Sequence, residues 1–175
     1  MAGKRVLAFD FGASSGRAIL ASYEDGKISM QEIHRFSNDP VTVCGVFHWD
    51  VLRLFFEIKQ GITKAVHQGG FDAIGIDTWA VDFVLLDADN KRIGDAVAYR
   101  DERTEGIREE LEKEYGLTFA DHYARTGIQY QPFNTVYQLM ALKKEHPEQL
   151  AAAKTFLMVP DYLNYLLCGV PANEY

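Results

Sequence analysis

The alternation of apolar and polar residues predicts three strands at the start of the chain. Residues 5–11 form a short apolar run that stops at an aspartate and a glycine, which is typical of a buried strand ending in a turn. Residues 17–23 have an apolar centre, and after the Asp25-Gly26 turn signal residues 27–36 alternate as a third strand would. Tight turns between three consecutive strands predict an antiparallel meander.

The strongest helical signal comes after a loop predicted at residues 37–47. Asp50 is suited to cap a helix, and apolar residues then recur at steps of three and four between Val51 and Val66. The Gly69-Gly70 pair is a typical stop. This pattern predicts one long amphipathic helix with its apolar side on a sheet.

The rest of the chain predicts shorter elements and an α/β fold with a mixed sheet and flanking helices. The expected strands and extended pieces are residues 73–77, 83–86, 94–99 and 156–159, and the expected helices are residues 104–115, 134–144 and 160–167. There is no repeat, low-complexity segment or linker. Because the chain stops just after a turn at residue 169, we expect residues 1–175 to be one domain of a longer protein.

The composition limits the classes of molecule that the protein is expected to bind. The 175 residues are 47% hydrophobic, which suffices for a real core, and the net charge of -7 argues against nucleic acid or an anionic membrane as the main partner. Cys44 and Cys168 lie far apart and outside any metal-binding pattern, which favours two reduced thiols. With neither a signal peptide nor a membrane-length apolar run, the sequence predicts a cytoplasmic protein.

Residues 10–17, Asp-Phe-Gly-Ala-Ser-Ser-Gly-Arg, lie between the first two predicted strands and carry candidate chemistry. The two glycines permit a tight turn and close approach to a ligand, and the N–H groups and hydroxyls between them can form an oxyanion nest. Neither a Walker A loop nor a dinucleotide fingerprint is present, and an ordinary hairpin turn is the alternative. The predicted phosphate-binding residues are Ala13, Ser14, Ser15, Gly16 and Arg17. Asp10 would fit there if Mg²⁺, held through water, lies between it and the phosphates.

A second polar group follows the predicted strand at residues 73–77, at a place where open α/β sheets bind ligands. Asp77, Thr78, Trp79 and Asp82 offer carboxylates, a hydroxyl and an aromatic face, as a sugar requires. The alternatives are a structural acceptor for Asp77 and a core position for Trp79. Arg100 is expected either to pair with Asp101 or Asp82, or to reach a sugar hydroxyl.

Residues 9–17 resemble the first phosphate motif of the actin-like, ribonuclease-H-like ATPases, and of the FGGY carbohydrate kinases among them. Further segments resemble the rhamnulokinase branch of that family, and they are residues 32–36, 75–83, 98–101, 127–129, 132–135 and 160–162. The resemblance covers nearly the whole chain. It implies a ribonuclease-H-like domain that acts with ATP and Mg²⁺ on L-rhamnulose, with Arg100, Phe133 and Asn134 facing the sugar together with the residue at Ala80, where relatives often have glycine.

The same resemblance implies an enzyme of two domains, of which residues 1–175 are the N-terminal one. The catalytic base of the family belongs to a His-Asp pair that this chain lacks, so no catalytic residue is assigned here and the isolated chain is expected to be inactive. The adenosine site is expected beyond Tyr175 as well. Another ketose such as xylulose or fuculose, and a non-catalytic nucleotide-binding module, are the alternative functions.

Overall fold

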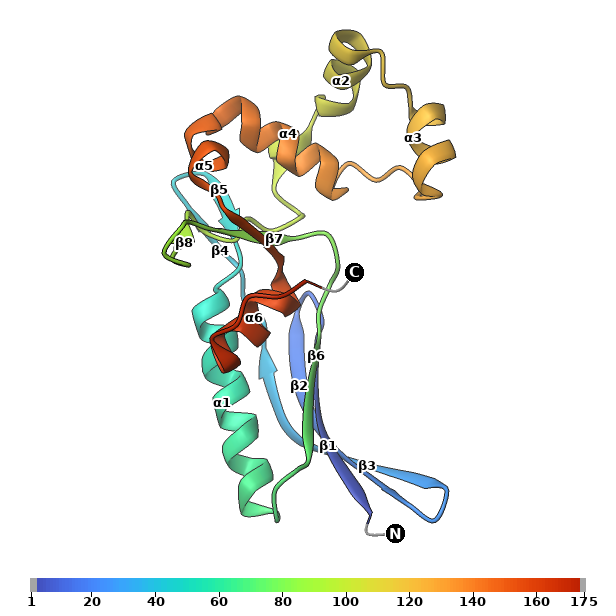
Figure 1. Cartoon of the computed structure of the whole chain (residues 1–175), viewed down its shortest axis with the longest axis vertical. Helices are drawn as coiled ribbons and strands as arrows, with labels where there is room; N and C mark the ends of the chain where they lie inside the picture. Colours follow the sequence, from blue (N-terminus) through green and yellow to red (C-terminus); the bar gives the residue numbers. More distant parts are fainter. Residues whose placement is uncertain (1–2, 174–175) are drawn as a thin grey trace. The chain divides into compact units, whose positions relative to one another are not determined.

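A computed structural model describes residues 3–173, and these residues form two compact units (Figure 1). The first unit comprises residues 3–41, 49–80 and 157–173, and the second comprises residues 42–48 and 81–156. No helix between residues 3 and 173 combines the length and apolar character needed to cross a membrane.

The first unit is built on a four-stranded sheet in the order β3-β2-β1-β6. Its strands are β1 (Lys4–Phe11), β2 (Ser15–Glu24), β3 (Lys27–Ser37) and β6 (Ala73–Asp77). The pairs β1-β2 and β2-β3 are antiparallel, whereas β1-β6 is parallel. The predicted N-terminal meander and the mixed sheet are therefore confirmed.

Two helices cover one face of this sheet, and they are α1 (Val51–His67) and α6 (Val159–Cys168). Alternate residues of β1 point to that face, so Leu7, Phe9 and Phe11 are buried with Ile58 of α1 and Leu163 of α6. Figure 1 shows α1 running along the sheet. The other alternate residues of β1, which include Asp10 near its carboxyl end, point to the opposite face.

The sequence signals at both ends of α1 are confirmed. The side chain of Asp50 accepts a hydrogen bond of 2.9 Å from the backbone N–H of Arg53, as a helix cap does. Past the last turn, Gly69 and Gly70 have φ values of 97° and 80°, which residues with a Cβ rarely adopt.

Gly61 in the middle of α1 is kept free of a side chain by the sheet beneath it. A Cβ there would lie 2.7 Å from two ring carbons of Phe9 and 3.0 Å from Cβ of Ala18. We expect Gly61→Ala to lower the free energy of unfolding by about 1–2 kcal/mol, because overpacking outweighs the helix propensity of roughly 1 kcal/mol that alanine adds. Urea unfolding measures this.

The matched control is Gly75→Ala on β6, where nothing lies within 4 Å of the added Cβ. This substitution should leave the free energy of unfolding unchanged or raise it by up to about 1 kcal/mol. A stabilised Gly61→Ala variant would contradict the packing described for α1.

Strand β3 contains a bulge opposite β2. Ala18 pairs with His34 but Ile19 pairs with Glu32, so Ile33 is the extra residue. Because of the bulge, His34 points toward α1, where its Nε2 lies 2.6 Å from Oε2 of Glu57. The bulge also places Glu32 and Arg35 on the open face of the sheet, which is the face opposite α1 and α6. Without a bulge, two strand residues three positions apart would point to opposite faces.

The buried carboxylate of Glu57 is the centre of a charged network between α1 and β3. Besides His34 it binds Arg53, whose Nη2 lies 2.5 Å from Oε1. The Nζ of Lys64 lies 2.8 Å from Nδ1 of His34. A lysine donates at that nitrogen, so His34 has its proton on Nε2 and donates it to Glu57. The network thus satisfies Glu57, which is only 3% exposed.

The second unit combines short strands with five helical segments. Its elements are β4 (Val41–Val43, which starts in the first unit), β5 (Val46–His48), β7 (Phe83–Leu86), β8 (Arg92–Ile93), η1 (Glu102–Thr104), α2 (Ile107–Tyr115), α3 (Phe119–Thr126), α4 (Thr135–Glu145), α5 (Pro147–Ala152) and the first half of β9 (Thr155–Met158). β4 pairs with β5, and a three-stranded sheet has the order β8-β7-β9.

Several boundaries in this unit differ from the sequence prediction. The predicted loop at residues 37–47 contains β4 and part of β5, which are too short to show a period. The helix expected from residue 104 begins at Ile107, because Gly106 with φ 74° separates it from η1. In the extended piece at residues 94–99, Val97 forms one isolated bridge with His48. α3 and α5 were not predicted, although the capping box at Thr118 marks the start of α3.

Candidate functional site

The tip of the β1-β2 hairpin is held in place by its own backbone and by Asn38. The N–H of Gly12 donates to the carbonyl of Ser15 at 2.8 Å. The buried Asn38 donates its side-chain Nδ2–H to the carbonyl of Gly12 at 2.9 Å and its backbone N–H to that of Ser14 at 3.0 Å. Sequence reasoning missed this role of Asn38, which has no local signal.

The donors left over at this tip suit an oxyanion. Within residues 3–173, the backbone N–H groups of Ala13 and Ser14 and the hydroxyls of Ser14 and Ser15 have no hydrogen-bond partner. Unused donors on a rigid turn can bind a phosphate without first breaking a protein contact. The assignment of Ala13, Ser14 and Ser15 to phosphate stays a prediction that this geometry supports.

Gly16 has a different reason to be glycine than the sequence suggested. It is buried, and a Cβ there would collide with the ring of Phe36 and lie 2.8 Å from Cδ1 of Phe11. The residue therefore makes room for two core rings, rather than for the close approach of a ligand. Its assignment to phosphate stays a prediction.

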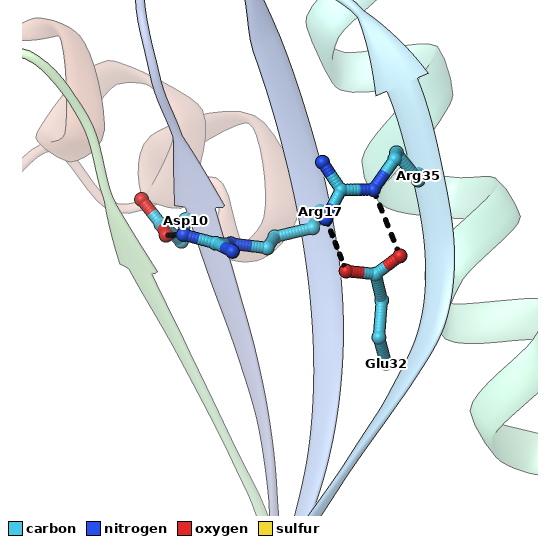
Figure 2. Close-up of polar contacts among 4 residues, drawn as sticks. All are labelled: Asp10, Arg17, Glu32 and Arg35. Atoms are coloured by element: carbon cyan, nitrogen blue, oxygen red, sulfur yellow. Dashed lines mark hydrogen bonds and ion pairs between the residues drawn. The ribbon is translucent and has the colours of Figure 1, made fainter.

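Asp10 and Arg17 bind each other across β1 and β2. Nε and Nη2 of Arg17 donate to Oδ2 of Asp10 at 2.8 and 2.6 Å (Figure 2). The two residues are register partners, and their side chains are 44% and 45% exposed. Sequence analysis expected separate roles for them, at a metal and at a phosphate. In this structure the guanidinium instead occupies one oxygen of the carboxylate.

Asp77 is the register partner of Asp10 on the other side, at the carboxyl end of β6. Partners in a parallel pair point to the same face, so the two carboxylates are neighbours at the end of the sheet. Within residues 3–173 no group of three His, Cys, Asp or Glu side chains could hold a metal ion. One or two carboxylates still suit Mg²⁺, which keeps several waters and takes its other ligands from phosphates.

Trp79 is part of a pair of tilted tryptophan rings in the first unit. Its ring centroid lies 3.9 Å from that of the buried Trp49, and its partly buried side chain packs against the main core cluster. This packing supports the core interpretation of Trp79, although its side chain is not fully buried. Next to it, the buried hydroxyl of Thr78 has no hydrogen-bond partner within residues 3–173, and Ala80 is exposed.

In the second unit, Asp82 is an internal anchor. It is 1% exposed, and its oxygens accept hydrogen bonds from the backbone N–H of Tyr99 at 3.0 Å and from Nε2 of Gln138 at 2.8 Å. The expectation that Asp82 binds a sugar directly is not supported by this geometry. It holds the backbone before Arg100 in place instead.

Gln138 was missed by sequence reasoning. It is buried on α4, where it donates to the carbonyl of Phe133 at 2.9 Å and accepts from Nη2 of Arg103 at 2.7 Å. It lies close enough to the carbonyl of Val81, at 3.3 Å, to donate there too. Val81 itself has a φ of 73°, unusual for a β-branched residue and typical of strain near functional sites. A glutamine on a helix gives no signal that it is buried.

Arg100 pairs with neither Asp101 nor Asp82, contrary to one of the expected alternatives. Its Cζ lies 5.5 Å from the centroid of the Tyr99 ring, and its side chain is exposed. The carboxylate of Asp101 accepts from the backbone N–H groups of Phe47 and Arg103 instead. Arg100 is left available for a ligand hydroxyl.

Phe133 and Asn134 lie at the start of α4. The Phe133 ring lies 5.1 Å from that of Tyr99. Asn134 is the residue that precedes α4, but its side chain makes no capping bond, since its Oδ1 accepts from the backbone N–H of Gln131 at 2.6 Å. Asn134 therefore does not cap α4 with its side chain, and its role at a sugar stays a prediction.

Comparisons with known proteins show the family to which this chain belongs. The model of the FGGY family of carbohydrate kinases, N-terminal domain, matches residues 5–175. Curated relatives include the rhamnulokinases of Halalkalibacterium halodurans, 52% identical over 171 residues, and Oceanobacillus iheyensis, 49% identical over 170 residues. Each alignment covers 97% of this chain but 36% of the relative, so the chain spans about a third of the length of these proteins.

Solved structures show the same fold at low identity. A gluconate kinase from Lactobacillus acidophilus matches with a TM-score of 0.80 at 20% identity over 97% of this chain and 34% of its own. A ligand-bound xylulose kinase from the same species matches with a TM-score of 0.79 at 21% identity over 96% of this chain and 34% of its own. The predicted fold of the actin-like ATPases is thereby confirmed, and the chain belongs to the FGGY family of carbohydrate kinases, matching its N-terminal domain.

Proposed function

We propose that this chain is the N-terminal domain of an ATP-dependent kinase that phosphorylates L-rhamnulose at its primary hydroxyl. The observation that carries the proposal is the identity of 49–52% to two curated rhamnulokinases over 97% of the chain. The solved kinases for other sugars are near 20% identical, which supports the fold alone. ATP and the sugar are its small-molecule partners, and we place the reaction in the cytoplasm, where ATP is supplied.

The hairpin tip and Arg17 bind the phosphates of ATP in this proposal. Ser14, Ser15 and the backbone N–H groups of residues 13 and 14 donate to phosphate oxygens, and Arg17 adds a planar cation that favours the charge of the transferred group. Asp10 and Asp77 would hold Mg²⁺, mainly through water, and that ion supplies neutralisation of phosphate charge when bound. Phosphoryl transfer depends mostly on such positioning and electrostatics.

The sugar-facing assignments are proposals as well. Asp77 ends β6 in the first unit, and Thr78, Trp79 and Ala80 follow it. The buried hydroxyl of Thr78 has an unmet hydrogen-bonding capacity that a sugar hydroxyl could satisfy. In the second unit, Arg100, Phe133 and Asn134 are the candidates. Asp82 helps to position the first two through its hydrogen bonds to Tyr99, which precedes Arg100, and to Gln138, which binds the carbonyl of Phe133. The base that takes the proton from the sugar hydroxyl is expected in a His-Asp pair outside residues 1–175.

The test is a chimaera in which this chain replaces the matching N-terminal 36% of the Halalkalibacterium halodurans rhamnulokinase. We expect the chimaera to phosphorylate L-rhamnulose with ATP, measured by coupled ADP release, and to prefer it over D-xylulose and L-fuculose. The chain alone should show no transfer. A folded chimaera that prefers another ketose would overturn the substrate assignment, and a chain active by itself would overturn the placement of the base.

A further inference from the structure

Four charged residues form a row across the open face of the first unit's sheet. Asp77 on β6, Asp10 on β1, Arg17 on β2 and Arg35 on β3 are successive register partners. Register partners lie directly opposite each other on one face, so the row runs from two carboxylates to two guanidiniums. Both arginines are well exposed, with Arg17 at 45% and Arg35 at 55%.

Two arginines directly opposite each other repel, and each one is balanced by its own carboxylate. Figure 2 shows Arg17 extending toward Asp10, whereas Arg35 is held by Glu32 at 2.9 and 2.6 Å. The hydrogen bonds from Arg35 lower the pKa of Glu32 from its ordinary value, and the nearby charge of Arg17 adds to this. The bulge at Ile33 is what brings Glu32 to this face.

Such a row has little value as a stabilising device. Exposed ion pairs contribute little to folding, and opposing like charges subtract from even that. Each guanidinium has five N–H donors, and each uses two of its nitrogens here, Nε and Nη2. The Nη1 groups of Arg17 and Arg35 have no partner within residues 3–173. The arrangement therefore keeps the guanidiniums of Arg17 and Arg35 side by side, each with unused N–H donors.

We propose that Arg35 is a second phosphate-binding residue that acts together with Arg17 on the polyphosphate of the nucleotide. The inference rests on the proposed kinase function and extends its phosphate site to β3. Oxygens of one phosphate chain accept N–H donors from both guanidiniums, and as Arg17 turns to the phosphate, Asp10 becomes free to face the cation. The five groups Asp77, Asp10, Glu32, Arg17 and Arg35 sum to a charge of -1, so the ligand is a phosphate accompanied by a divalent cation.

The experiment uses the whole chain and magnesium pyrophosphate as the probe. Titration is followed by NMR of the arginine Nε–Hε signals, which reports contact at each guanidinium without any enzymatic turnover. We expect the signals of Arg17 and Arg35 to shift with one shared dissociation constant. Arg17→Gln and Arg35→Gln should each weaken binding by about tenfold, as expected for the loss of a charge-assisted hydrogen bond.

Two further variants separate contact from mere charge. Arg35→Lys keeps the charge but loses the planar fork, and should weaken binding by less than Arg35→Gln does. Glu32→Gln releases Arg35 from its partner and should strengthen binding. The matched control is Arg92→Gln, which removes a similar i,i+3 pair with Asp95 in the second unit and should leave the dissociation constant unchanged.

The outcomes distinguish the two proposals. If Arg17→Gln weakens binding but Arg35→Gln, in a chain of unchanged thermal stability, does not, the role of Arg35 is refuted and the phosphate site at the hairpin stands. If neither arginine affects binding, or if the probe does not bind to the unmodified chain, both the arginine pair and the proposed phosphate site are refuted. Arg35→Gln and Arg92→Gln weakening binding equally would also overturn the proposal, because the effect would then be one of net charge.

Discussion

Arg17→Ala in the chimaeric kinase should lower kcat/KM for ATP by about a hundred- to a thousandfold. Phosphoryl transfer is promoted mainly by cations and donors positioned where negative charge develops, and the removal of one such group typically has an effect of this size. Arg17 lies at the start of β2, next to the free donors of the hairpin tip, and its side chain is exposed. Steady-state kinetics with varied ATP measures the change.

The separate effects of Arg17→Ala on kcat and on the affinity for ATP test the role of Arg17 further. Because Arg17 is exposed and paired only with Asp10, its loss should change thermal stability little. We expect kcat to fall more than the affinity for ATP, since the charge is needed most in the transition state. Arg92→Ala, which removes an arginine from an ion pair in the second unit, is the control and should keep full activity. An unchanged kcat/KM for Arg17→Ala would remove this residue from the phosphate site.

Glu57→Ala should lower the free energy of unfolding of the chain by about 3–5 kcal/mol. Removal of one partner from a buried charged network leaves the others unpaired, and this is more harmful than the loss of the attraction itself. Glu57 is 3% exposed and binds His34 and Arg53 at 2.6 and 2.5 Å. Urea unfolding followed by circular dichroism measures the loss.

Glu57→Gln keeps an acceptor for His34 and should retain more of the stability than Glu57→Ala. Glu112→Ala on α2 is the matched control, because Glu112 is an exposed helical glutamate without an ion pair among the described residues. Its effect should stay within about 0.5 kcal/mol. If Glu57→Ala cost less than about 1 kcal/mol, the network would not bind α1 to β3 in the way described.

Local patterns were enough to predict the frame of the first unit. The strands of the meander, the helix between Asp50 and Gly69, and the polar hairpin at residues 10–17 each depend on periodicity, turn residues or caps within a few positions. The resemblance to the FGGY carbohydrate kinases was visible for the same reason, since it rests on short continuous segments. The comparison with the family model confirmed it.

Short elements of the second unit were predicted less well. β4 and β5 have three residues each, which is too few to show an alternation. α3 and α5 have eight and six residues, and in a bundle of small helices the apolar contacts come from neighbours rather than from a long periodic face. Their starts carried signals in Thr118 and Pro147, but a start signal without a following period predicts little.

The sequence by itself determined the strand-turn-strand segment at residues 10–17, to which we assign the phosphate chemistry, because such a pattern is encoded locally. Only the tertiary structure decided how they pair. The binding of Arg17 to Asp10, the bulge that turns Arg35 and Glu32 to one face, and the burial of Asp82 under Gln138 all depend on strand register or on contacts between distant segments. A shift of one residue in register reverses the face of every side chain. The alternation in residues 27–36 did not indicate the bulge that produces such a shift in β3.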